Sequence, residues 1–598
     1  MKIKVSDYIA NFLSKNGITD VFTVTGGGAM HLNDSLGHHP NLKCTYNHHE
    51  QACAIAAEGY TRVSGKLAAV CVTSGPGGTN AITGVLGGWL DSIPMFILSG
   101  QVKRETTISS TNLPLRQLGD QEFNIVECVK TMTKYAKMIS EPNEIAYHLE
   151  KALYIALHGR GGPVWLDIPL DVQGTVVDTD KLVHFDKNEL ISQEIPKVKN
   201  DVVAQIIDKI KTAKRPVIIA GTGIRLGQAH DEFLKLIEKL NIPVVTAWNA
   251  HDVLWNSHRL FCGKPSTVGT RGGNFVVENS DLLISLGCRL NIRQISYNYK
   301  NFAKNAYKII VDIDAAELQK PTISPDLPIH ADVKDVIGKL LETEFVNQNE
   351  EHVKWLEWCK AVNEKYPACL PKYYEKNLPM NPYAFIDTLF KILPEDEPII
   401  CGNGSACVIT FQTAEVKKGQ RLFTNSGCAS MGYGFPAAIG VAVNLAGKRV
   451  ICIDGDGSFQ MNLQELQTVV HNNLNLKTII LNNNGYHSIR QTQTNLFSSH
   501  PLAGVSKENG ISFPECEKLA ACYGLKYVKI DNISTAKEKI KEFLNFDGPA
   551  ICEAVVDPTQ NFEPKLSSKV LPDGKITSPL LDDMFPFLSR EEYQSNKF

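Results

Sequence analysis

The sequence predicts an α/β protein with three doubly wound domains, each built around a parallel sheet. Two observations lead to this prediction. Short apolar runs such as RVICI (449–453) and LKTIIL (476–481) have the composition of strands that are buried on both faces. Segments with apolar residues at helical spacing separate such runs, and glycine-rich or polar turns follow the runs. Strands that alternate with helices in this way are typical of doubly wound parallel sheets.

The strand–turn pattern divides the chain into three blocks and a tail. The first block covers 1–180 and contains DVFTVTGGG, VCVTSGPGG and FILSGQV. A polar stretch without periodicity leads to the second block, 198–345, which contains RPVIIAGTG and KIIVDID. The third block, 379–560, contains PIICGNGS and RVICIDGDGS. We expect one domain per block, followed by a polar tail, 561–598, with scattered apolar anchors.

Composition excludes several classes of protein. The 598 residues are 43% hydrophobic and 21% charged, which is typical of globular domains. A net charge of -3 gives no basic excess for binding nucleic acid. The 15 cysteines show no Cys-x-x-Cys pair or zinc spacing, which indicates a reducing compartment. Neither a signal peptide nor a long apolar run is recognisable, so we expect a cytoplasmic protein without membrane contact.

Polar residues follow two strands of the third block that we expect to be neighbours. Asp456 lies between two glycines after one strand, and Asn483 and Gly485 follow the next strand. Open α/β sheets bind ligands at the carboxyl ends of their strands. A carboxylate, an amide oxygen and a backbone carbonyl suit Mg²⁺, which also binds substrate phosphates. Glycines let the backbone approach a phosphate, and Ser458 and the following helix start supply N–H donors.

The spacing of these turns, Gly-Asp-Gly followed after 24 residues by Asn-Asn, resembles the thiamine diphosphate (ThDP) motif of ThDP-dependent enzymes. HHEQACAIAAEGYTRVSGK (48–66), the segment 73–102 and NSGCASMGYGFPAAIG (425–440) resemble other parts of the same family. The resemblance covers nearly the whole chain, in the order pyrimidine-binding, central and diphosphate-binding domain. It implies an enzyme that uses ThDP and Mg²⁺.

The resemblance implies a role for each matching residue. Glu50 is expected to hydrogen-bond the aminopyrimidine ring and so to promote deprotonation of the thiazolium ring, although by itself it could be a charge at a helix start. Met431 is expected under the thiazolium ring, with core packing as the alternative, and the Ala429 carbonyl is expected to accept from the 4′-amino group. The implied metal ligands are Asp456, Asn483 and Gly485. The implied cofactor-binding residues are Glu50, Gly402, Asn403, Gly404, Ser405, Ala429, Met431, Gly455, Asp456, Gly457, Ser458, Asn483, Gly485 and Tyr486.

In this family the pyrimidine-binding and diphosphate-binding sides of one site come from different subunits. Glu50 and Asp456 lie in different blocks of the chain. The resemblance therefore implies a homodimer with active sites at the subunit interface, or a tetramer built from such dimers.

Within the family the chain most resembles the acetolactate synthase large subunits, which carry FAD in the central domain. Gln121, in LGDQEF, matches a Phe-Gln-Glu of that branch, and this implies a catalytic role, although Asp120 replaces the Phe. GCRLNIR (287–293) resembles GARFDDR, so Arg293 is expected to hold an acceptor carboxylate. The implied FAD residues are Gly221, Gly223, Arg289, Asp312 and Asp332. An empty dinucleotide site is the alternative, because FAD has no redox task in this chemistry.

The segment after Asn-Asn departs from that branch. Ser488 and Thr492 stand where acetolactate synthases have Met and Trp, so the acceptor pocket is expected to be roomier and more polar. NNNGYHSIRQTQTN and LPDGKITSPLLDDMFPFLSR resemble ThDP proteins of bacterial surface-polysaccharide pathways. His487 is expected as a catalytic acid or base and Arg490 near a sugar-linked phosphate, with hydrogen bonding inside the loop as the alternative. Gly27 is a further expected substrate contact.

We therefore expect a ThDP- and Mg²⁺-dependent decarboxylase-carboligase. It would transfer an acyl unit, acetyl from pyruvate, to the carbonyl of a keto-sugar nucleotide. The alternatives are acetolactate synthase, a decarboxylase or C–C hydrolase that couples nothing, and an inactive scaffold on the same fold. The presence of Glu50, Asp456 and Asn483 argues against the scaffold.

Overall fold

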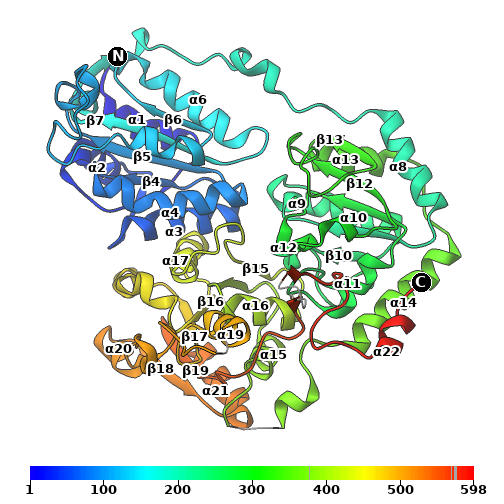
Figure 1. Cartoon of the computed structure of the whole chain (residues 1–598). Helices are drawn as coiled ribbons and strands as arrows, with labels where there is room; N and C mark the ends of the chain where they lie inside the picture. Colours follow the sequence, from blue (N-terminus) through cyan, green and yellow to red (C-terminus); the bar gives the residue numbers. More distant parts are fainter. Residues whose placement is uncertain (376–377, 498, 568, 571–574) are drawn as a thin grey trace.

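The computed structural model describes residues 1–375, 378–497, 499–567, 569–570 and 575–598. It confirms the predicted fold class, because three separate α/β domains each contain one parallel sheet of five or six strands (Figure 1). A short antiparallel pair joins β1 (Lys2–Lys4) to β8 (Val176–Asp178). Part of the tail motif used above, 571–574, lies outside the described residues.

The sheet of the first domain has the strand order β3-β2-β4-β5-β7-β6. Helices α1, α2 and α6 cover one face, and α3 and α4 cover the other, so the sheet is doubly wound. Every residue of β5 and β7 is buried, as expected for central strands. The strands are β2 (Asp20–Thr23), β3 (Lys43–Tyr46), β4 (Ala69–Val72), β5 (Met95–Gln101), β6 (Tyr135–Met138) and β7 (Pro163–Pro169). The helices are α1 (Val5–Lys15), α2 (Met30–His38), α3 (Glu50–Ser64), α4 (Pro76–Asp91), α5 (Ile125–Val129), α6 (Ile145–Leu157) and α7 (Leu170–Gly174).

The central domain has a five-stranded sheet in the order β10-β9-β11-β12-β13. Its strands and helices share one hydrophobic core. The strands are β9 (Pro216–Ala220), β10 (Val244–Thr246), β11 (Leu282–Leu286), β12 (Tyr307–Asp312) and β13 (Leu327–His330). The helices are α8 (Asn200–Thr212), α9 (Gly223–Leu226), α10 (His230–Leu240), α11 (Arg271–Glu278), α12 (Ile292–Ile295), α13 (Val333–Glu342) and α14 (Glu350–Lys365).

The third domain has six parallel strands in the order β15-β14-β16-β17-β19-β18. Helices α17 and α18 cover one face, and α15, α16 and α21 cover the other. The strands are β14 (Pro398–Cys401), β15 (Arg421–Phe423), β16 (Val450–Gly455), β17 (Leu476–Asn482), β18 (Lys526–Ile530) and β19 (Ala550–Val555). The helices are α15 (Pro382–Ile392), α16 (Ser405–Thr413), α17 (Gly434–Leu445), α18 (Leu466–His471), α19 (His487–Leu496), α20 (Cys516–Cys522) and α21 (Ile533–Asn545).

The first and third domains share a core where α3 packs on α17 (Figure 1). The two helices approach so closely that a Cβ atom on Gly440 would lie 1.8 Å from the carbonyl oxygen of Ala56. A Cβ atom on Gly59 would lie 2.5 Å from the carbonyl oxygen of Ala437. Only glycine fits at these two positions, because Cβ atoms in proteins do not approach other atoms this closely.

Buried charges accompany the contact between the two helices. Arg62 on α3 pairs with Glu58 on the same helix and with Asp91 at the end of α4 (2.8 Å). The hydroxyl of Tyr433, just before α17, donates to Glu58 (2.7 Å), and the Gly427 N–H donates to Asp91 (2.8 Å). Burial raises the pKa of Glu58, although Arg62 opposes this effect. Removing one partner of such a pair generally costs about 3–5 kcal/mol, because the other charge stays buried and unpaired.

A second buried ion pair connects all three domains. Asp252 of the central domain pairs with Arg225 of the same domain and with Arg421 at the start of β15 (2.6 Å). The Arg421 guanidinium also donates to the backbone carbonyls of Val63 and Arg62 at the end of α3. Asp252 is buried, but the two arginines hold the pKa of its carboxyl below the ordinary value despite that burial.

The C-terminal tail runs from the third domain onto the central domain and completes its core. Leu581 and Tyr593 belong to the central core, and Phe598 packs on the ring of Trp358. Asn279, at the end of α11, donates to the Asn596 carbonyl (2.9 Å) and accepts from the Phe598 N–H (3.0 Å). The described tail also contains β20 (Lys569–Val570), β21 (Ile576–Thr577) and α22 (Arg590–Ser595). The tail is thus part of the central domain rather than an appendage.

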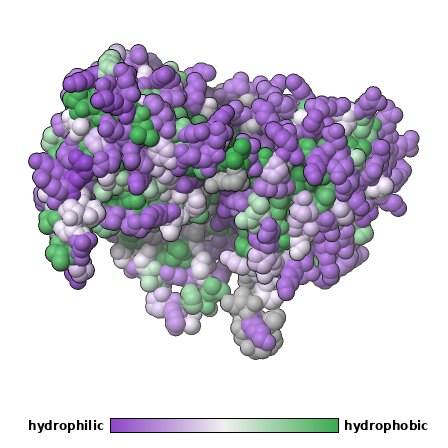
Figure 2. Space-filling model, turned by 90° about the horizontal axis from the view of Figure 1, so that it is seen from above, coloured by the Kyte–Doolittle hydropathy of each residue, from purple (hydrophilic) through white to green (hydrophobic). Residues whose placement is uncertain are grey.

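Figure 2 shows a face that is mainly hydrophilic, with hydrophobic residues scattered over it. Within the described part of the chain, no helix combines the length and the apolar character that a membrane span requires.

Replacing Gly440 by Ala is expected to destabilise the protein by about 1–3 kcal/mol, because the added methyl overlaps the α3 backbone. This loss exceeds the gain of up to about 1 kcal/mol from the better helix propensity of Ala. The check is the midpoint of urea-induced unfolding. Gly338 in α13 is the matched control, because nothing lies within 4 Å of its added Cβ, and Gly338→Ala should keep or raise the midpoint. A Gly440→Ala protein as stable as its control would contradict the tight α3–α17 contact.

Candidate active site

Asp456 and Asn483 lie next to each other at the carboxyl ends of two paired strands. Strands β16 and β17 are parallel, with Gly455 opposite Leu481. The Asp456 carboxylate accepts from the N–H groups of Gly457 (2.8 Å) and Gly485 (2.9 Å). The structure therefore brings the two predicted polar turns together, as expected from the sheet topology.

The donor set of these turns fits a cation. Asp456 is buried, and burial raises the pKa of its carboxyl to about 6. Asn483 donates to the hydroxyl of Ser405 (3.2 Å), but its buried Oδ1 has no partner among the described residues. An unneutralised carboxylate beside an unpaired amide oxygen is unfavourable without a ligand. Both atoms are oxygen ligands of the kind that Mg²⁺ binds. No cluster of three His, Cys, Asp or Glu side chains suited to a metal occurs among the described residues.

Asp454 is a second buried carboxylate beside this turn, and the sequence analysis did not select it. Its Oδ1 accepts from the Gly455 N–H (2.8 Å), and its Oδ2 has no partner in the described residues. Burial raises the pKa of this carboxyl to about 7. A Cβ atom on Gly402 would lie 2.0 Å from Asp454 Oδ1, so Asp454 explains why position 402 is glycine. The only sequence signal was the extra Asp in IDGDG.

The turn between β14 and α16 forms the opposite wall of the site. Gly404 has a positive φ of 59°, which favours glycine, and Ser405 begins α16. Asn403 donates to the carbonyl of Ala429 (2.9 Å), the carbonyl that was predicted to bind the 4′-amino group. A Cβ atom on Gly404 would lie 3.4 Å from Ser488 Oγ. The predicted cofactor turn and the predicted acceptor residue Ser488 are therefore neighbours.

The segment before α17 presents Met431 next to the Gly-Asp-Gly turn. Ala429 has a φ of 52° and Gly432 a φ of 81°. The Gly432 N–H donates to the hydroxyl of Ser458 (3.0 Å), which anchors the segment to the diphosphate turn. Met431 is 38% exposed, which is high for a methionine. Its placement fits the predicted support of a ring better than it fits core packing.

Glu50 is the first residue of α3, in the first domain. Its carboxylate accepts from the Asn80 side chain (3.0 Å) and lies 3.6 Å from the His49 ring. Burial raises the pKa of the Glu50 carboxyl, but the hydrogen bonds from His49 and Asn80 outweigh burial and leave the pKa below its ordinary value. The carboxylate is thus ionised and ready to accept a hydrogen bond. Among the described residues, no hydrogen bond or ion pair links it to the third domain.

The other predicted residues of the first domain flank the same glycine-rich turn. Gln121 has a φ of 60°, and its carbonyl oxygen would lie 2.5 Å from a Cβ atom on Gly75. A Cβ atom on Gly77 would lie 3.7 Å from Glu50 Oε1. Gly27 is exposed, and the next residue, Gly28, donates its N–H to Thr73 Oγ1 (3.0 Å). Gln121 and Glu50 thus both lie beside this turn, Gln121 at Gly75 and Glu50 at Gly77.

The start of α19 places Tyr486, His487 and Arg490 beside the metal turn. A Cβ atom on Gly457 would lie 2.2 Å from the Tyr486 ring, so this ring covers the Gly-Asp-Gly turn. The Arg490 guanidinium donates to the carbonyls of Asn483 (3.0 Å) and Asn484 (2.6 Å). Arg490 therefore braces the turn, and its contact with an acceptor stays a prediction.

His487 is buried, and neither ring nitrogen forms a hydrogen bond with a described residue. Burial and the charge of Arg490 lower its pKa to about 4, whereas the nearby carbonyls of Pro558 and Gln560 oppose this effect without reaching hydrogen-bond geometry. The ring is thus neutral near pH 7. It has a free nitrogen to accept a proton and a free N–H to donate one.

The predicted FAD residues occupy the strand ends of the central domain. Cβ atoms on Gly221 and Gly223 would lie 2.2 Å and 2.7 Å from backbone atoms of Gly287, so strand packing alone explains both glycines. Asp312 accepts from the Asp314 N–H (2.9 Å), and Asp332 caps α13 by accepting from the Lys334 N–H (2.8 Å). These contacts are compatible with a dinucleotide site and also with an empty one.

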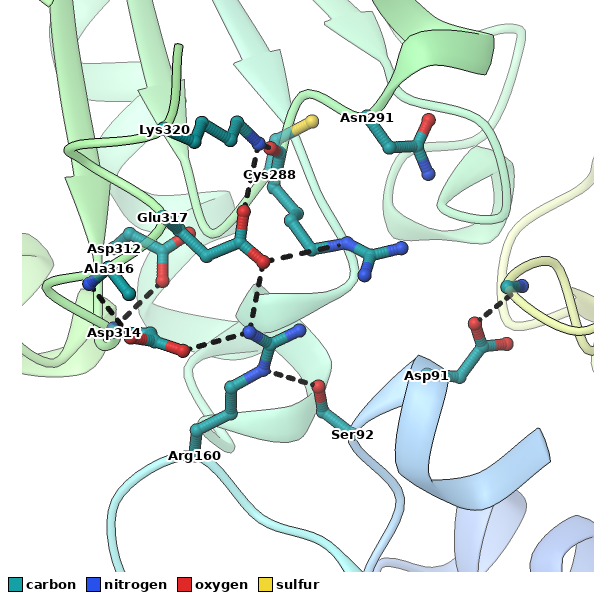
Figure 3. Close-up of polar contacts among 12 residues, drawn as sticks. Asp91, Ser92, Arg160, Cys288, Asn291, Asp312, Asp314, Ala316, Glu317 and Lys320 are labelled. Atoms are coloured by element: carbon teal, nitrogen blue, oxygen red, sulfur yellow. Dashed lines mark hydrogen bonds and ion pairs between the residues drawn. The ribbon is translucent and has the colours of Figure 1, made fainter. Parts of the chain in front are cut away.

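Arg289 belongs to an ion-pair network between the first and central domains (Figure 3). Its Nε lies 3.9 Å from Glu317, and Lys320 pairs with the same carboxylate (2.8 Å). Arg160 of the first domain reaches across to Glu317 and Asp314, both at 2.9 Å. The network thus holds Arg289 at the boundary between two domains.

Arg293, the predicted carboxylate-binding residue, is exposed on α12. Its guanidinium carbon lies 5.5 Å from the centre of the Trp248 ring, and no described carboxylate pairs with it. Burial raises the pKa of Cys407 in α16 to about 12, and the charge of Arg293 opposes that rise. Within the described part of the chain, Arg293 is therefore a cation without an anionic partner, close to the helix that starts at the Gly402–Ser405 turn.

Comparisons with known proteins agree with this geometry. Three models described as the N-terminal TPP binding domain, the central domain and the C-terminal TPP binding domain of a thiamine pyrophosphate enzyme match residues 3–125, 203–340 and 402–554. A probable acetolactate synthase large subunit of Methanococcus aeolicus is 32% identical over 93% of this chain and 92% of its own length. The acetolactate synthase large subunit of Lactococcus lactis is 30% identical over 97% of each chain.

The chain therefore belongs to the thiamine pyrophosphate enzyme family, and ThDP is its cofactor. Within that family it is an acetolactate synthase-like enzyme of the carboligase and lyase type that acts on small molecules. The predicted resemblance is thus confirmed.

Replacing Asp456 by Asn is expected to stabilise the metal-free protein at neutral pH. The carboxyl ionises near its ordinary value of 3.8 in the unfolded chain and near 6 in the folded chain. Folding therefore takes up a proton between these values, so the stability that this group contributes is lost as the pH rises from about 4 to about 6. The thermal unfolding midpoint of Asp456→Asn should exceed that of the unsubstituted protein above about pH 6 and match it below about pH 4.

Addition of ThDP and Mg²⁺ should reverse this order, because ligands that bind the folded state stabilise it and the amide is the poorer metal ligand. The exposed Asp547 provides the control, and Asp547→Asn should follow the unsubstituted protein at every pH. Identical midpoints for Asp456→Asn and the unsubstituted metal-free protein from pH 4 to 8 would be incompatible with an unneutralised buried carboxylate.

Proposed function

We propose that this chain is a ThDP- and Mg²⁺-dependent carboligase that moves a two-carbon acyl unit from a 2-oxo acid such as pyruvate to an acceptor carbonyl of a keto-sugar nucleotide. The observation that carries this proposal is the position of Ser488. Its hydroxyl lies against Gly404 of the cofactor turn, where a relative with an apolar pocket would place an apolar side chain. A polar residue there suits an acceptor rich in hydroxyl groups.

The metal in this proposal is Mg²⁺, held by Asp456, Asn483 and the Gly485 carbonyl. The unpaired Asn483 Oδ1 and the buried Asp456 carboxylate supply two oxygen ligands. The N–H groups at the start of α16, beside Ser405, are suited to bind phosphate oxygens. Together these groups would fix the diphosphate end of the cofactor.

When bound, ThDP supplies the carbanion chemistry of the reaction. The protein supplies the groups around it. The ionised Glu50 would accept a hydrogen bond from a protonated nitrogen of the pyrimidine ring, the Ala429 carbonyl would accept from the amino group, and Met431 would support the thiazolium ring. The neutral His487 ring, whose buried nitrogens have no hydrogen-bond partner among the described residues, would exchange a proton with an acceptor oxygen.

The working unit that we propose is a homodimer in which Glu50 of one protomer serves the diphosphate turn of its partner. Two observations support it. Among the described residues, the hydrogen bond and the ion pair of the Glu50 carboxylate are both made within its own domain. Exposed apolar side chains occur both in the first domain (Leu113, Leu118 and Phe123) and near the diphosphate turn (Met431 and Met461). Two such dimers would form a tetramer.

We further propose a reducing compartment, the cytoplasm, because all 15 cysteines are free. FAD at the central strand ends is a proposal that rests on Arg289 and Asp312. The test is the visible absorbance of the purified protein. Bound flavin absorbs at about 450 nm, and the protein without flavin does not.

Acetolactate synthase is the second candidate, and Arg293 is the observation that favours it. An exposed guanidinium without a described carboxylate partner suits the carboxylate of a 2-oxo acid acceptor. The two candidates differ in their products, so one experiment separates them. Purified protein is incubated with ThDP, Mg²⁺ and pyruvate, with and without a keto-sugar nucleotide, and the products are identified by mass spectrometry. A sugar that is heavier by the two-carbon unit supports the first proposal, and rapid formation of acetolactate from pyruvate alone supports the second.

Replacing Glu50 by Gln is expected to slow pyruvate consumption by about 10²–10⁴-fold, because a neutral amide is a much weaker partner for the pyrimidine ring. The affinity for ThDP and Mg²⁺ should fall far less, because the diphosphate turn is unchanged. Glu127, an exposed glutamate paired with Lys130, is the control, and Glu127→Gln should keep full activity. A Glu50→Gln enzyme with normal turnover would refute the role of Glu50, and a lack of turnover in the unsubstituted protein would favour the scaffold.

A further inference from the structure

The first part of the C-terminal tail, 557–567, lies across helix α19. Arg490 on this helix donates to the carbonyl of Pro558 (3.2 Å), and the His487 ring packs edge-on against Phe562 at 5.2 Å. Gln491, one turn after His487, is also buried. The Gln491 Nε2 donates to Asn561 Oδ1 (2.6 Å). With its amide reversed, the Gln491 oxygen would instead accept from the Phe562 N–H (3.2 Å) and from Lys565 Nζ (3.1 Å). The tail therefore brings Lys565 to the helix that carries the predicted acceptor residues.

Lys565 is a half-buried cation, and its ammonium group would have one neutral side-chain partner among the described residues, the Gln491 amide in its reversed orientation. Burial lowers the pKa of its ammonium group, and the charge of Glu563 opposes that effect. No carboxylate lies within ion-pair distance of Lys565 among the described residues. A cation held in this way is suited to receive an anion, because the desolvation of the ammonium group is otherwise not compensated by an opposite charge.

Backbone hydrogen bonds through Thr267 connect the tail segment next to Lys565 with the backbone of Arg293. The N–H of Leu566 donates to the Thr267 carbonyl (2.7 Å), and the Thr267 N–H donates to the Arg293 carbonyl (2.9 Å). Two cations without a described carboxylate partner, Lys565 and Arg293, are therefore carried by neighbouring backbones. His487 is buried, and its ring nitrogens have no hydrogen-bond partner among the described residues. The positive charge of Lys565 contributes to the lowering of the His487 pKa.

We infer that Lys565, carried over α19 by the C-terminal tail, binds a phosphate group of the acceptor and makes the enzyme specific for phosphorylated acceptors. This inference rests on the proposed function and adds a residue from outside the third domain to its substrate site. Lysine is suited to this task because its ammonium group is a compact point charge that pairs with phosphate oxygens. The phosphate can belong to a nucleoside diphosphate or to a sugar monophosphate, and these two sources share the same recognition chemistry.

The test measures binding to the full-length protein saturated with ThDP and Mg²⁺, so that the probes do not compete for the cofactor turn. Uridine diphosphate and glucose 1-phosphate are titrated by calorimetry, with uridine and glucose as uncharged controls. Lys565→Met and Lys565→Gln should each weaken binding of a phosphorylated probe by about tenfold or more, the usual effect of losing a hydrogen bond to a charged group. Lys565→Arg should restore most of the affinity, since it restores the charge.

Lys537, an exposed lysine on α21, is the matched control, and Lys537→Met should bind the probes like the unsubstituted protein. Loss for uridine diphosphate alone identifies a nucleotide acceptor, and loss for both probes identifies the phosphate itself; either result supports the inference. Unchanged affinity in Lys565→Met and Lys565→Gln, or no binding of either probe to the unsubstituted protein, overturns it.

The proposed function is tested separately with the same set of proteins. Consumption of pyruvate without an acceptor depends on Glu50 and the metal turn, so it is measured in the unsubstituted protein, and Lys537→Met should match it. Binding of the probes with no pyruvate consumption would leave the anion site intact and reject the reaction. Pyruvate consumption with unchanged probe affinity in the variants would reject only the role of Lys565.

Discussion

The close packing of α3 against α17 is the constraint on which the rest of the structure depends. The backbones of α3 and α17 are in contact at Gly59 and Gly440. This close packing fixes the distance between the two helices and leaves them little freedom to slide along each other. The buried ion pairs of Arg62 with Glu58 and Asp91 lie beside this contact. They also require these side chains to keep a fixed orientation. Because Glu50 begins one of these helices and Met431 precedes the other, the packing fixes how the pyrimidine-binding residues face the rest of the molecule.

Buried polar groups without compensation indicate the position of the site more clearly than the shape of the surface does. Asp454 and Asp456 are both buried with raised pKa values, and Asn483 has an unpaired oxygen. Each of these features is unfavourable in the folded chain by itself. In the proposed metal site, the oxygen atoms of Asp456 and Asn483 would already be in place before a cation arrives, and this preorganisation would lower the reorganisation needed on binding.

The sequence predicted the three parallel-sheet domains and the pairing of the Asp456 and Asn483 turns, because both follow from local strand–turn patterns. It did not predict the environment of individual side chains. His487 was expected as a catalytic acid or base, but the sequence did not reveal that burial and the charge of Arg490 lower its pKa to about 4. For Arg490 the structure shows hydrogen bonds to loop carbonyls, the alternative given above, and its contact with a substrate phosphate stays a prediction. Asp454 and Lys565 escaped notice because the residues that pack against them, Gly402 and Gln491, come from segments far away in the sequence, which no periodicity reveals.

The path of the C-terminal tail has a consequence for how the chain is made. The central domain is encoded in the middle of the sequence, yet Tyr593 is part of its core and Asn279 binds the last residues. Domains commonly fold in order during synthesis, N-terminal first. Here the core of the middle domain stays incomplete until Tyr593 and Phe598 have been synthesised, after the whole third domain. A nascent chain that has reached only the third domain would therefore combine a finished first domain with an open middle one.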